Sequence, residues 1–316
     1  MKAILLHKFG GLDAFEISEV PAPVPAIGEV LVKVITFNVS PLELKIRHGE
    51  AKMYIRRKLP MILGSDFAGD VVAVGEDVKD FKIGDAVLGA VDPFKNNGPY
   101  AEYVVTPATL LHHKPRELSY ENACTLPIAG MSSLQCLRDL GKLQAGQKVL
   151  ILGASGALGL FGIQLAKYMG ATVTAVCSGI NATLVREFGA DKVIDYLKHP
   201  IFETANTYDL VYDAVNKYSF EEAKKVLKKG GIYVNTVPSP KLLLRTLLNP
   251  FYSQKMKLLL LKQNPADLAL LVDLVSKDIL KVHVENIYTG LESIYDATKR
   301  LETARVRGKL VIRLIF

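Results

Sequence analysis

The sequence is poor in cysteine. Its 316 residues include three, Cys124, Cys136 and Cys177, and no two of them form a CxxC pair. Such spacing supplies neither a disulfide framework nor a zinc knuckle, and it suits a reducing compartment, so we expect a cytoplasmic location. No stretch reaches 18 uncharged apolar residues, which predicts no stable membrane insertion. The apolar run that begins at Lys2 is too short for a signal sequence and is typical of a first strand.

Other absences narrow the function further. The chain has no internal repeat and no low-complexity tract. It also lacks a compact stripe of Lys and Arg with interleaved aromatics, so a net charge of +7 does not predict a nucleic-acid partner. The charge fits anionic ligands or a solvated surface. With 49% hydrophobic and 22% charged residues, the chain is globular and long enough for two domains with their own cores.

Residues 148–178 have the pattern of a strand, a glycine-rich turn, a helix and a second strand. Lys148–Leu152 is a short apolar run, typical of a strand buried on both faces. After the turn, apolar residues recur three and four apart as far as Gly170, which predicts a helix. Ala171–Cys177 predicts the second strand. A unit of about thirty residues in this order is the frame in which a glycine-rich turn binds a dinucleotide.

The turn itself reads A-x-G-x-x-G, at Ala154, Gly156 and Gly159. Gly156 lets the backbone approach a pyrophosphate, Gly159 lets the helix pack closely on the strand, and the helix N-terminus offers free N–H groups. The same pattern also fits a tight turn in any parallel sheet, but the flanking strands favour a cofactor. The expected cofactor contacts in this turn are Gly153, Ser155, Gly156, Ala157, Leu158 and Gly159.

Acidic residues are absent where the second predicted strand ends. About 20 residues after the turn, an NAD enzyme usually places Asp or Glu on the ribose 2′-hydroxyl, whereas residues 177–181 read CSGIN. The missing acid leaves room for a 2′-phosphate, with Ser178 as a donor, and favours NADP. No cation stands in the same segment. Arg186, Lys192 and Lys198 are the candidates to fold back toward the phosphate.

The rest of the chain shows two kinds of pattern. Up to residue 116, short apolar runs alternate with Gly, Pro and Asp turns, which predicts a strongly bent β-barrel. Its expected strands are Lys2–His7, Phe15–Val20, Glu29–Thr36, Asp66–Val74, Asp85–Val91 and Tyr100–Thr106. After Glu117, strands and helices alternate, as in a parallel sheet covered on both faces. A helix is expected over Phe220–Lys228 and a last strand of this sheet over Met256–Leu261.

Three motifs carry a family resemblance that spans nearly the whole chain. Residues 74–87 read VGEDVKDFKIGDAV, residues 189–196 read GADKVIDY, and Gly308-Lys309 precedes the closing strand. Together they resemble the medium-chain dehydrogenases/reductases, within them the quinone oxidoreductase group, close to the reticulon-interacting oxidoreductase branch. The resemblance implies an α/β fold: a GroES-like β-barrel catalytic domain from residues 1–119 and 263–316, and a Rossmann domain with a doubly wound parallel sheet over 120–262. The active site would lie in the cleft between the two.

The resemblance also predicts whether a metal is present. Zinc-dependent members carry a cysteine, a histidine and a third ligand at places that here correspond to Asn38, Ser65 and the segment Pro127–Gly130. A catalytic zinc needs three side-chain ligands, and none remains at these places. We therefore expect no metal. The chemistry that remains is hydride delivery from NADPH to an activated acceptor, either a quinone or an α,β-unsaturated carbonyl.

Candidate site residues follow from the same comparison. Asn38 and Ser40 stand where zinc and its proton-relay partner would be, although Asn38 also fits a turn residue before Pro41. Tyr54 is a possible proton donor in the basic segment 46–59, which also fits a solvated helix. The expected catalytic residues are Asn38, Ser40 and Tyr54. The cofactor contacts that the family implies outside the turn are Ser133, Tyr196 and Lys309, and Tyr196 also fits plain sheet packing.

Two other functions fit the same residues. One is a nucleotide-sensing binding protein with little turnover, and the other is an NAD(P)-dependent alcohol dehydrogenase-like enzyme or enoyl-thioester reductase.

A second open question is the stretch Lys241–Lys262, which holds nine Leu, five basic residues and no acid. It fits a lid over an apolar pocket, a subunit interface or a basic surface that touches membranes. We favour burial of this stretch against protein, and we therefore expect a homodimer. The expected substrate is a small molecule.

Overall fold

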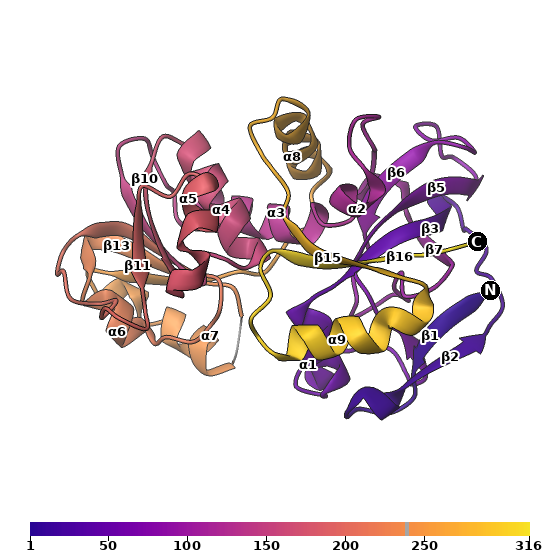
Figure 1. Ribbon diagram of the computed structural model, residues 1–316, viewed down its shortest axis with the longest axis horizontal. Helices are drawn as coiled ribbons and strands as arrows, with labels where there is room; N and C mark the ends of the chain where they lie inside the picture. Colours follow the sequence, from indigo (N-terminus) through magenta and orange to yellow (C-terminus); the bar gives the residue numbers. More distant parts are fainter. Residues whose placement is uncertain (238–239) are drawn as a thin grey trace. The chain divides into compact units, whose positions relative to one another are not determined.

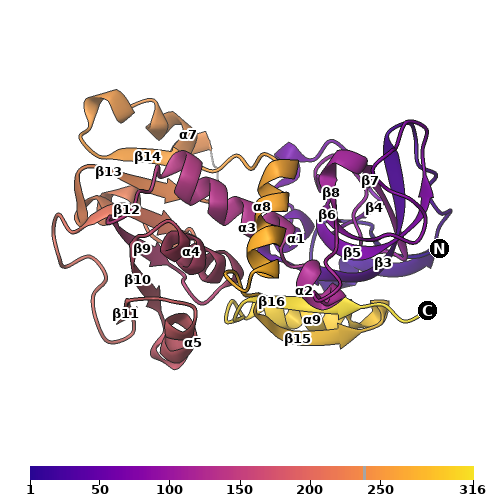
Figure 2. The same cartoon turned by 90° about the horizontal axis from the view of Figure 1, so that it is seen from above.

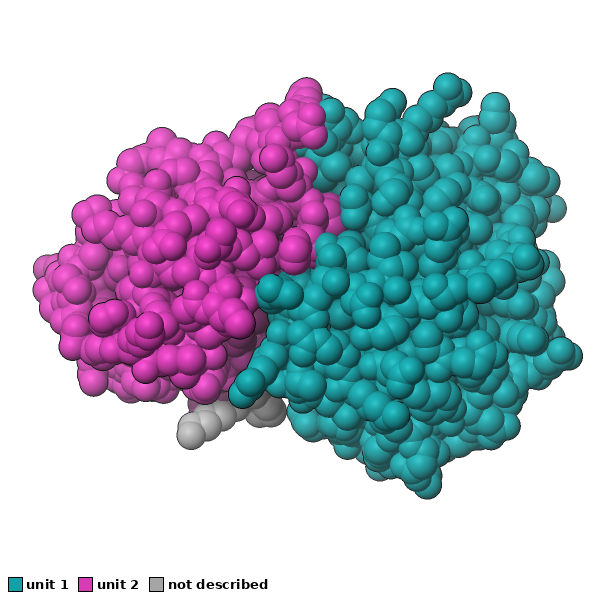
Figure 3. Space-filling model, in the orientation of Figure 1, with its two compact units in different colours: residues 1–128, 263–276, 284–316 teal, residues 129–262, 277–283 magenta. Residues whose placement is uncertain are grey.

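The computed structural model of the protein describes residues 1–237 and 240–316. The chain folds into two compact units, coloured separately in Figure 3. Unit 1 comprises residues 1–128, 263–276 and 284–316, and unit 2 comprises residues 129–262 and 277–283. Each unit has its own sheets and its own hydrophobic core.

Unit 1 is the β-rich unit, and its strands form two sheets. The smaller sheet has the order β2-β1-β4 and the larger one the order β15-β16-β3-β5-β6-β8, with β7 also paired to β3. The strands are β1 (Lys2–Leu6), β2 (Phe15–Glu19), β3 (Glu29–Val39), β4 (Met61–Ile62), β5 (Asp66–Val74), β6 (Ala86–Ala90), β7 (Tyr103–Pro107), β8 (Leu111–His113), β15 (Val284–Thr289) and β16 (Lys309–Arg313).

Strand β3 joins distant parts of the chain in unit 1. Val30, Val32 and Val34 are buried on one face while the residues between them are partly exposed, as the alternation predicts. The strand runs three residues beyond the expected end at Thr36. The extension follows from the closing strand β16, because Val311 pairs with Asn38 in antiparallel register. Figure 2 shows β16 alongside β3.

The helices of unit 1 are short and flank these sheets. They are α1 (Pro41–Arg47), α2 (Tyr120–Ala123), α8 (Pro265–Ser276) and α9 (Ile294–Glu302), while α3 (Pro127–Gln135) begins in unit 1 and continues into unit 2. The interpretation of residues 46–59 as a solvated helix is wrong. Helix α1 ends at Arg47, whose fully buried side chain forms an ion pair with Glu302, and only a 3₁₀ turn at Lys52–Tyr54 follows.

Unit 2 is built on a parallel sheet of strand order β11-β10-β9-β12-β13-β14, the doubly wound arrangement of dinucleotide-binding domains. Its strands are β9 (Lys148–Leu152), β10 (Thr172–Cys177), β11 (Lys192–Asp195), β12 (Tyr208–Asp213), β13 (Leu227–Asn235) and β14 (Lys255–Leu258). Its helices, besides α3 and the π-helix Cys136–Leu140, are α4 (Ala157–Tyr168), α5 (Ala182–Glu187), α6 (Phe220–Lys224) and α7 (Pro240–Thr246). Figure 1 shows α4 and α5 on one side of the sheet and α6 and α7 on the other.

Two predicted boundaries in unit 2 need correction. Helix α6 ends at Lys224 instead of Lys228, because Leu227 already pairs with Tyr208 as the first residue of β13. Strand β14 ends at Leu258 instead of Leu261. Within residues 1–237 and 240–316, no helix combines the length and the apolar character needed to cross a membrane.

Candidate functional site

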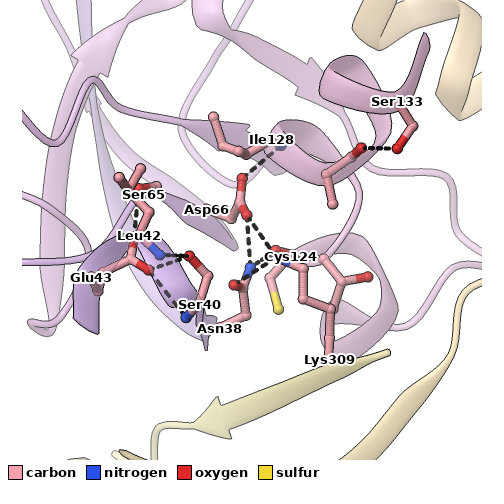
Figure 4. A network of polar contacts seen from close by, with 12 residues as sticks. Asn38, Ser40, Leu42, Glu43, Ser65, Asp66, Cys124, Ile128, Ser133 and Lys309 are labelled. Atoms are coloured by element: carbon pink, nitrogen blue, oxygen red, sulfur yellow. Dashed lines mark hydrogen bonds and ion pairs between the residues drawn. The ribbon is translucent and has the colours of Figure 1, made fainter. Parts of the chain in front are cut away.

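A buried polar network lies in unit 1 where strands β3, β5 and β16 meet helix α2 (Figure 4). The Asn38 amide donates to the Asp66 carboxylate over 2.9 Å and to the Cys124 carbonyl over 2.6 Å. Its own oxygen accepts from the Lys309 ammonium at 2.9 Å. Asn38 is therefore a buried strand residue held by three partners, and the alternative that it is a turn residue is wrong.

Asp66 is the second centre of this network. One of its carboxylate oxygens lies 3.3 Å from Lys309 Nζ, and the other accepts from the backbone N–H of Ile128 at 2.8 Å. The Lys309 side chain is 7% exposed and the Asp66 side chain 2%, so the ion pair is withdrawn from water. A buried pair of this kind persists because its remaining polar atoms are hydrogen-bonded. Asn38 and Ile128 supply those bonds.

A second chain of hydrogen bonds begins at Ser40, the residue that caps helix α1. Its hydroxyl donates to the Glu43 carboxyl over 2.5 Å, and the Ser65 hydroxyl donates to the other Glu43 oxygen over 2.6 Å. The backbone N–H of Ser40 also donates to Glu43, which completes a capping box. Glu43 and Ser65 are buried, whereas Ser40 is partly exposed.

Burial is the largest cause of the pKa shifts of Glu43, Tyr100 and Cys124. It raises the pKa of Glu43, and the nearby Asp66 carboxylate acts in the same direction, whereas the two serine hydroxyls and Lys309 oppose it. Burial also raises the pKa of Tyr100, whose hydroxyl has no hydrogen-bond partner among the described residues. Burial raises the pKa of the Cys124 thiol to about 12, so this cysteine is not a thiolate nucleophile at neutral pH.

Tyr54 does not join the network in unit 1. It lies in the 3₁₀ turn at Lys52–Tyr54, its side chain is 39% exposed, and its ring packs edge-on against Phe94 with the centroids 6.0 Å apart. A role for Tyr54 as a proton donor stays a prediction.

The glycine-rich turn in unit 2 has the geometry that the motif predicts. A Cβ at Gly159 would lie 2.4 Å from the Gly153 carbonyl oxygen and 2.5 Å from Ala154 Cα, so only glycine allows helix α4 to approach β9 this closely. At Gly156 the nearest atom to such a Cβ is 3.6 Å away, which leaves the backbone open on that side. Gly156 is also the N-cap of α4 and has no side-chain cap bond. These features fit a pyrophosphate held by the first N–H groups of α4.

The residues after β10 gather beside this turn. Asn181 donates from its amide to the hydroxyls of Ser155 and Ser178, at 3.1 and 3.2 Å. Asp195, the last residue of β11, lies against Gly179, where a Cβ would be 2.4 Å from its carboxylate. A carboxylate of the neighbouring strand thus lies beside residues 177–181, which contain no acid themselves, and the order of residues in the chain does not reveal this.

Tyr196 and Ser133 lie in different environments within unit 2. The Tyr196 ring is 42% exposed, and Lys217 Nζ lies 5.6 Å from its centroid, so plain sheet packing does not describe it. Ser133 is fully buried in helix α3. Its hydroxyl bonds to the carbonyls of Ala129 and Leu158, which ties α3 to the first turn of α4. Contact of either residue with a cofactor stays a prediction.

The positions that correspond to zinc ligands hold side chains already engaged in hydrogen bonds. Asn38 contacts Asp66, Cys124 and Lys309, and Ser65 contacts Glu43. Within the described part of the chain, no three His, Cys, Asp or Glu side chains are grouped so that they could hold a metal ion. The residues at these positions therefore do not fit a catalytic zinc.

Comparison with known proteins agrees with both units. A family model described as an alcohol dehydrogenase GroES-like domain matches residues 26–116, and one described as a zinc-binding dehydrogenase matches residues 188–312. The chloroplastic quinone-oxidoreductase QR1 of Triphysaria versicolor is 33% identical over 327 residues, covering 99% of this chain and 98% of that protein. The human mitochondrial NAD(P)H oxidoreductase RTN4IP1 is 35% identical over 261 residues, covering 75% and 65% respectively.

A solved structure gives the same result. The quinone oxidoreductase from Coxiella burnetii has a TM-score of 0.91 at 31% identity and covers 100% of this chain and 99% of that one. A GroES-like unit together with a doubly wound unit that carries a glycine-rich turn defines an oxidoreductase of the nicotinamide-nucleotide type. The chain belongs to the medium-chain dehydrogenases/reductases, in their quinone oxidoreductase group.

Proposed function

We propose that the protein is a zinc-independent, NADPH-dependent oxidoreductase that transfers a hydride to a quinone or an α,β-unsaturated carbonyl. The observation that carries this proposal is that Asn38, at the place of one zinc ligand, is bound in a buried network with Asp66 and Lys309. Such acceptors need no Lewis acid, because conjugation already activates the carbon that receives the hydride. Hydrogen-bond donors suffice to stabilise the negative charge that develops on oxygen.

Each unit has a separate task in this proposal. When bound, NADPH supplies the hydride from its nicotinamide. The turn from Gly153 to Gly159 would hold its pyrophosphate, and Ser178 and Tyr196 would contact its adenosine end. In unit 1, Ser40 would orient the acceptor, whereas Asn38, whose amide hydrogens go to Asp66 and Cys124, would hold the buried network together with Lys309. Positioning of the acceptor against the nicotinamide and exclusion of water would then account for most of the rate acceleration.

The test is NADPH oxidation against a panel of quinones and enones, before and after exhaustive chelation. We expect turnover with at least one acceptor, unchanged by chelation, in protein with sub-stoichiometric zinc. Stoichiometric zinc whose removal abolishes activity would contradict zinc independence. Tight nucleotide binding without turnover would instead support a nucleotide-sensing protein. Turnover confined to alcohols or to enoyl thioesters would support the remaining alternatives.

NADPH should bind more tightly than NADH, but only modestly. Ser178 and the cation of Lys217 beside Tyr196 favour a 2′-phosphate, whereas the Asp195 carboxylate against Gly179 opposes it. One charge at about 4 Å in a solvated site changes affinity by about 1 kcal/mol, or about fivefold. Asp195→Asn should therefore raise the NADPH preference about fivefold, and Ser178→Asp should reverse part of it. Titration of both nucleotides decides the matter, since equal or tighter binding of NADH by the wild type would refute the NADP assignment.

The Leu-rich stretch leaves an apolar patch on unit 2. The side chains of this patch are 41% to 82% exposed in the single chain. The patch consists of Leu243, Leu244, Leu247, Leu248 and Phe251. A patch of this kind marks an interaction surface. The side chain of Lys241 lies outside the described residues. Two other cations of the stretch face the protein: Arg245 lies over the rings of Phe220 and Tyr252, and Lys255 donates to backbone carbonyls.

Lys257 and Lys262 are exposed, but Arg245 and Lys255 do not point outward toward anionic lipid. A homodimer therefore covers this patch better than a membrane does. Strand β14 is also the last strand of its sheet, and a second copy could pair with such an edge across a two-fold axis. We expect sedimentation velocity to show a dimer, and we expect this dimer not to bind anionic vesicles. Leu247→Glu should yield monomer, while Val24→Glu, at an 85% exposed site in unit 1, should not. A monomer that co-sediments with anionic vesicles in a salt-sensitive way would favour the membrane instead.

The proposed compartment rests on the cysteines. All three are free and buried, which fits a reducing environment such as the cytoplasm.

A further inference from the structure

The buried carboxyl of Glu43 has no task in the function proposed above. Its side chain is almost fully enclosed, yet one oxygen is 2.5 Å from the Ser40 hydroxyl and the other 2.6 Å from the Ser65 hydroxyl. Of the three residues, only Ser40 is partly exposed. A proton on Glu43 therefore has one short route outward, through the hydroxyl of Ser40.

The proposed reaction requires such a proton. A hydride carries two electrons to the acceptor and leaves NADP⁺, so reduction of an enone produces an enolate and reduction of a quinone produces a hydroquinone anion. Each must then gain one proton at oxygen, or at the α-carbon in the case of an enolate. A positioned acid next to this oxygen accelerates such a step.

We propose that Glu43 supplies this proton through Ser40. When Glu43 is protonated, its O–H donates to the Ser40 oxygen, and the Ser40 hydroxyl is free to turn its hydrogen toward the acceptor oxygen. The Ser40 hydroxyl then gives this hydrogen to the acceptor and receives one from the Glu43 carboxylic acid, which becomes a carboxylate. Water then returns a proton to Glu43 through the same Ser40 hydroxyl, so that one hydride and one proton are consumed per turnover. This inference rests on the proposed oxidoreductase function, and it makes Glu43 a residue that acts through Ser40 without touching the substrate.

The surroundings of Glu43 favour its acid form. The charged and titratable groups that face it from other elements are Asp66 at the start of β5, Lys309 at the start of β16 and Tyr100, whose hydroxyl is buried. Desolvation and the Asp66 carboxylate raise the pKa of Glu43, and Lys309 lowers it, with desolvation the largest effect. Glu43 therefore keeps its proton to a higher pH than an exposed glutamate does.

A purely structural role gives a different expectation. Ser40 and Glu43 form the capping box of α1, and glutamine at the same position preserves that box. Glu43→Gln therefore removes the titrating proton and leaves the helix cap in place. Glu50→Gln is the matched control, because Glu50 is an exposed glutamate just beyond the end of the same helix.

The experiment is the pH profile of kcat/KM for an enone that the wild type reduces with NADPH. Because the acid form is the donor, wild-type activity should fall as pH rises through the pKa of Glu43. Glu43→Gln should lower kcat/KM at low pH roughly 100-fold, and its pH profile should no longer show this fall. Its midpoint of thermal unfolding should equal that of the wild type. Ser40→Ala should cause a similar loss, and the double variant should be no worse than either single one. Glu50→Gln should behave as wild type.

The outcomes separate the two proposals. Suppose that the wild type reduces the enone and that Glu43→Gln keeps both the wild-type rate and the fall in kcat/KM with rising pH. The proton route is then wrong and the oxidoreductase function stands. Additive losses in the double variant would also overturn the route, because they would show that Ser40 and Glu43 act independently. If the wild type reduces no quinone or enone at any pH, the proposed function fails and the proton route fails with it.

Discussion

Replacing Lys309 by methionine should destabilise the protein by about 3–5 kcal/mol, because the Asp66 carboxylate would stay buried without its counter-charge. Asp66 is 2% exposed and would keep only the hydrogen bonds from Asn38 and Ile128. Urea unfolding at neutral pH gives the free energy of unfolding directly. The double variant Lys309→Met/Asp66→Asn should recover part of the loss, since it removes the uncompensated charge.

A surface ion pair supplies the control for this prediction. Lys8 and Asp13 approach to 2.6 Å, but their side chains are 63% and 70% exposed. Lys8→Met should therefore leave the free energy of unfolding close to that of the wild type, because solvent screens an exposed pair. Equal effects of Lys8→Met and Lys309→Met would show that the network in unit 1 does not hold a buried charge pair.

Gly159→Ala should abolish nucleotide binding and cost roughly 3 kcal/mol of stability, the upper end for overpacking. The added methyl group would lie within 2.6 Å of three backbone atoms of Gly153 and Ala154, and backbone cannot move aside as a flexible side chain can. Helix α4 would have to move away from β9, which would displace the N–H groups that we propose hold the pyrophosphate.

Gly156→Ala separates folding from binding in the same turn. Its new methyl group meets no atom closer than 3.6 Å, so the stability should stay near that of the wild type. Nucleotide affinity should still fall, because the methyl group stands where the backbone is open to the ligand. Calorimetric titration with NADPH, paired with urea unfolding of each variant, measures both quantities. Wild-type affinity in Gly156→Ala would show that the pyrophosphate does not lie there.

Local patterns in the sequence predict the elements of both units well. Strands β5 and β9 have their predicted bounds, and the glycine-rich turn follows β9 as expected. These features depend on residues that are close in the chain: a short apolar run, a glycine, a helical period. The ends of β3 and α6 were harder to predict, because pairing with distant β16 extends the first and pairing with β12 shortens the second.

The candidate site was only partly predictable for the same reason. Asn38 and Lys309 were identified by the family resemblance, but their contact joins residues 271 positions apart. The approach of Asp195 to Gly179 depends on the parallel pairing of β10 with β11. Glu43 carried one local signal, the spacing S-x-x-E of Ser40 and Glu43, which indicates a capping box but not its burial. Burial depends on the whole folded unit, and burial is what raises the pKa of Glu43.

Deuterium transfer tests the central claim most directly. The protein is incubated with NADPH deuterated at C4 of the nicotinamide, on each face in turn, and with an enone that it reduces. We expect one deuterium from one face only, at the β-carbon of the saturated product. When the label is in the solvent instead, we expect no deuterium at that carbon. Absence of deuterium from that carbon, or equal transfer from both faces, would contradict hydride transfer by this protein.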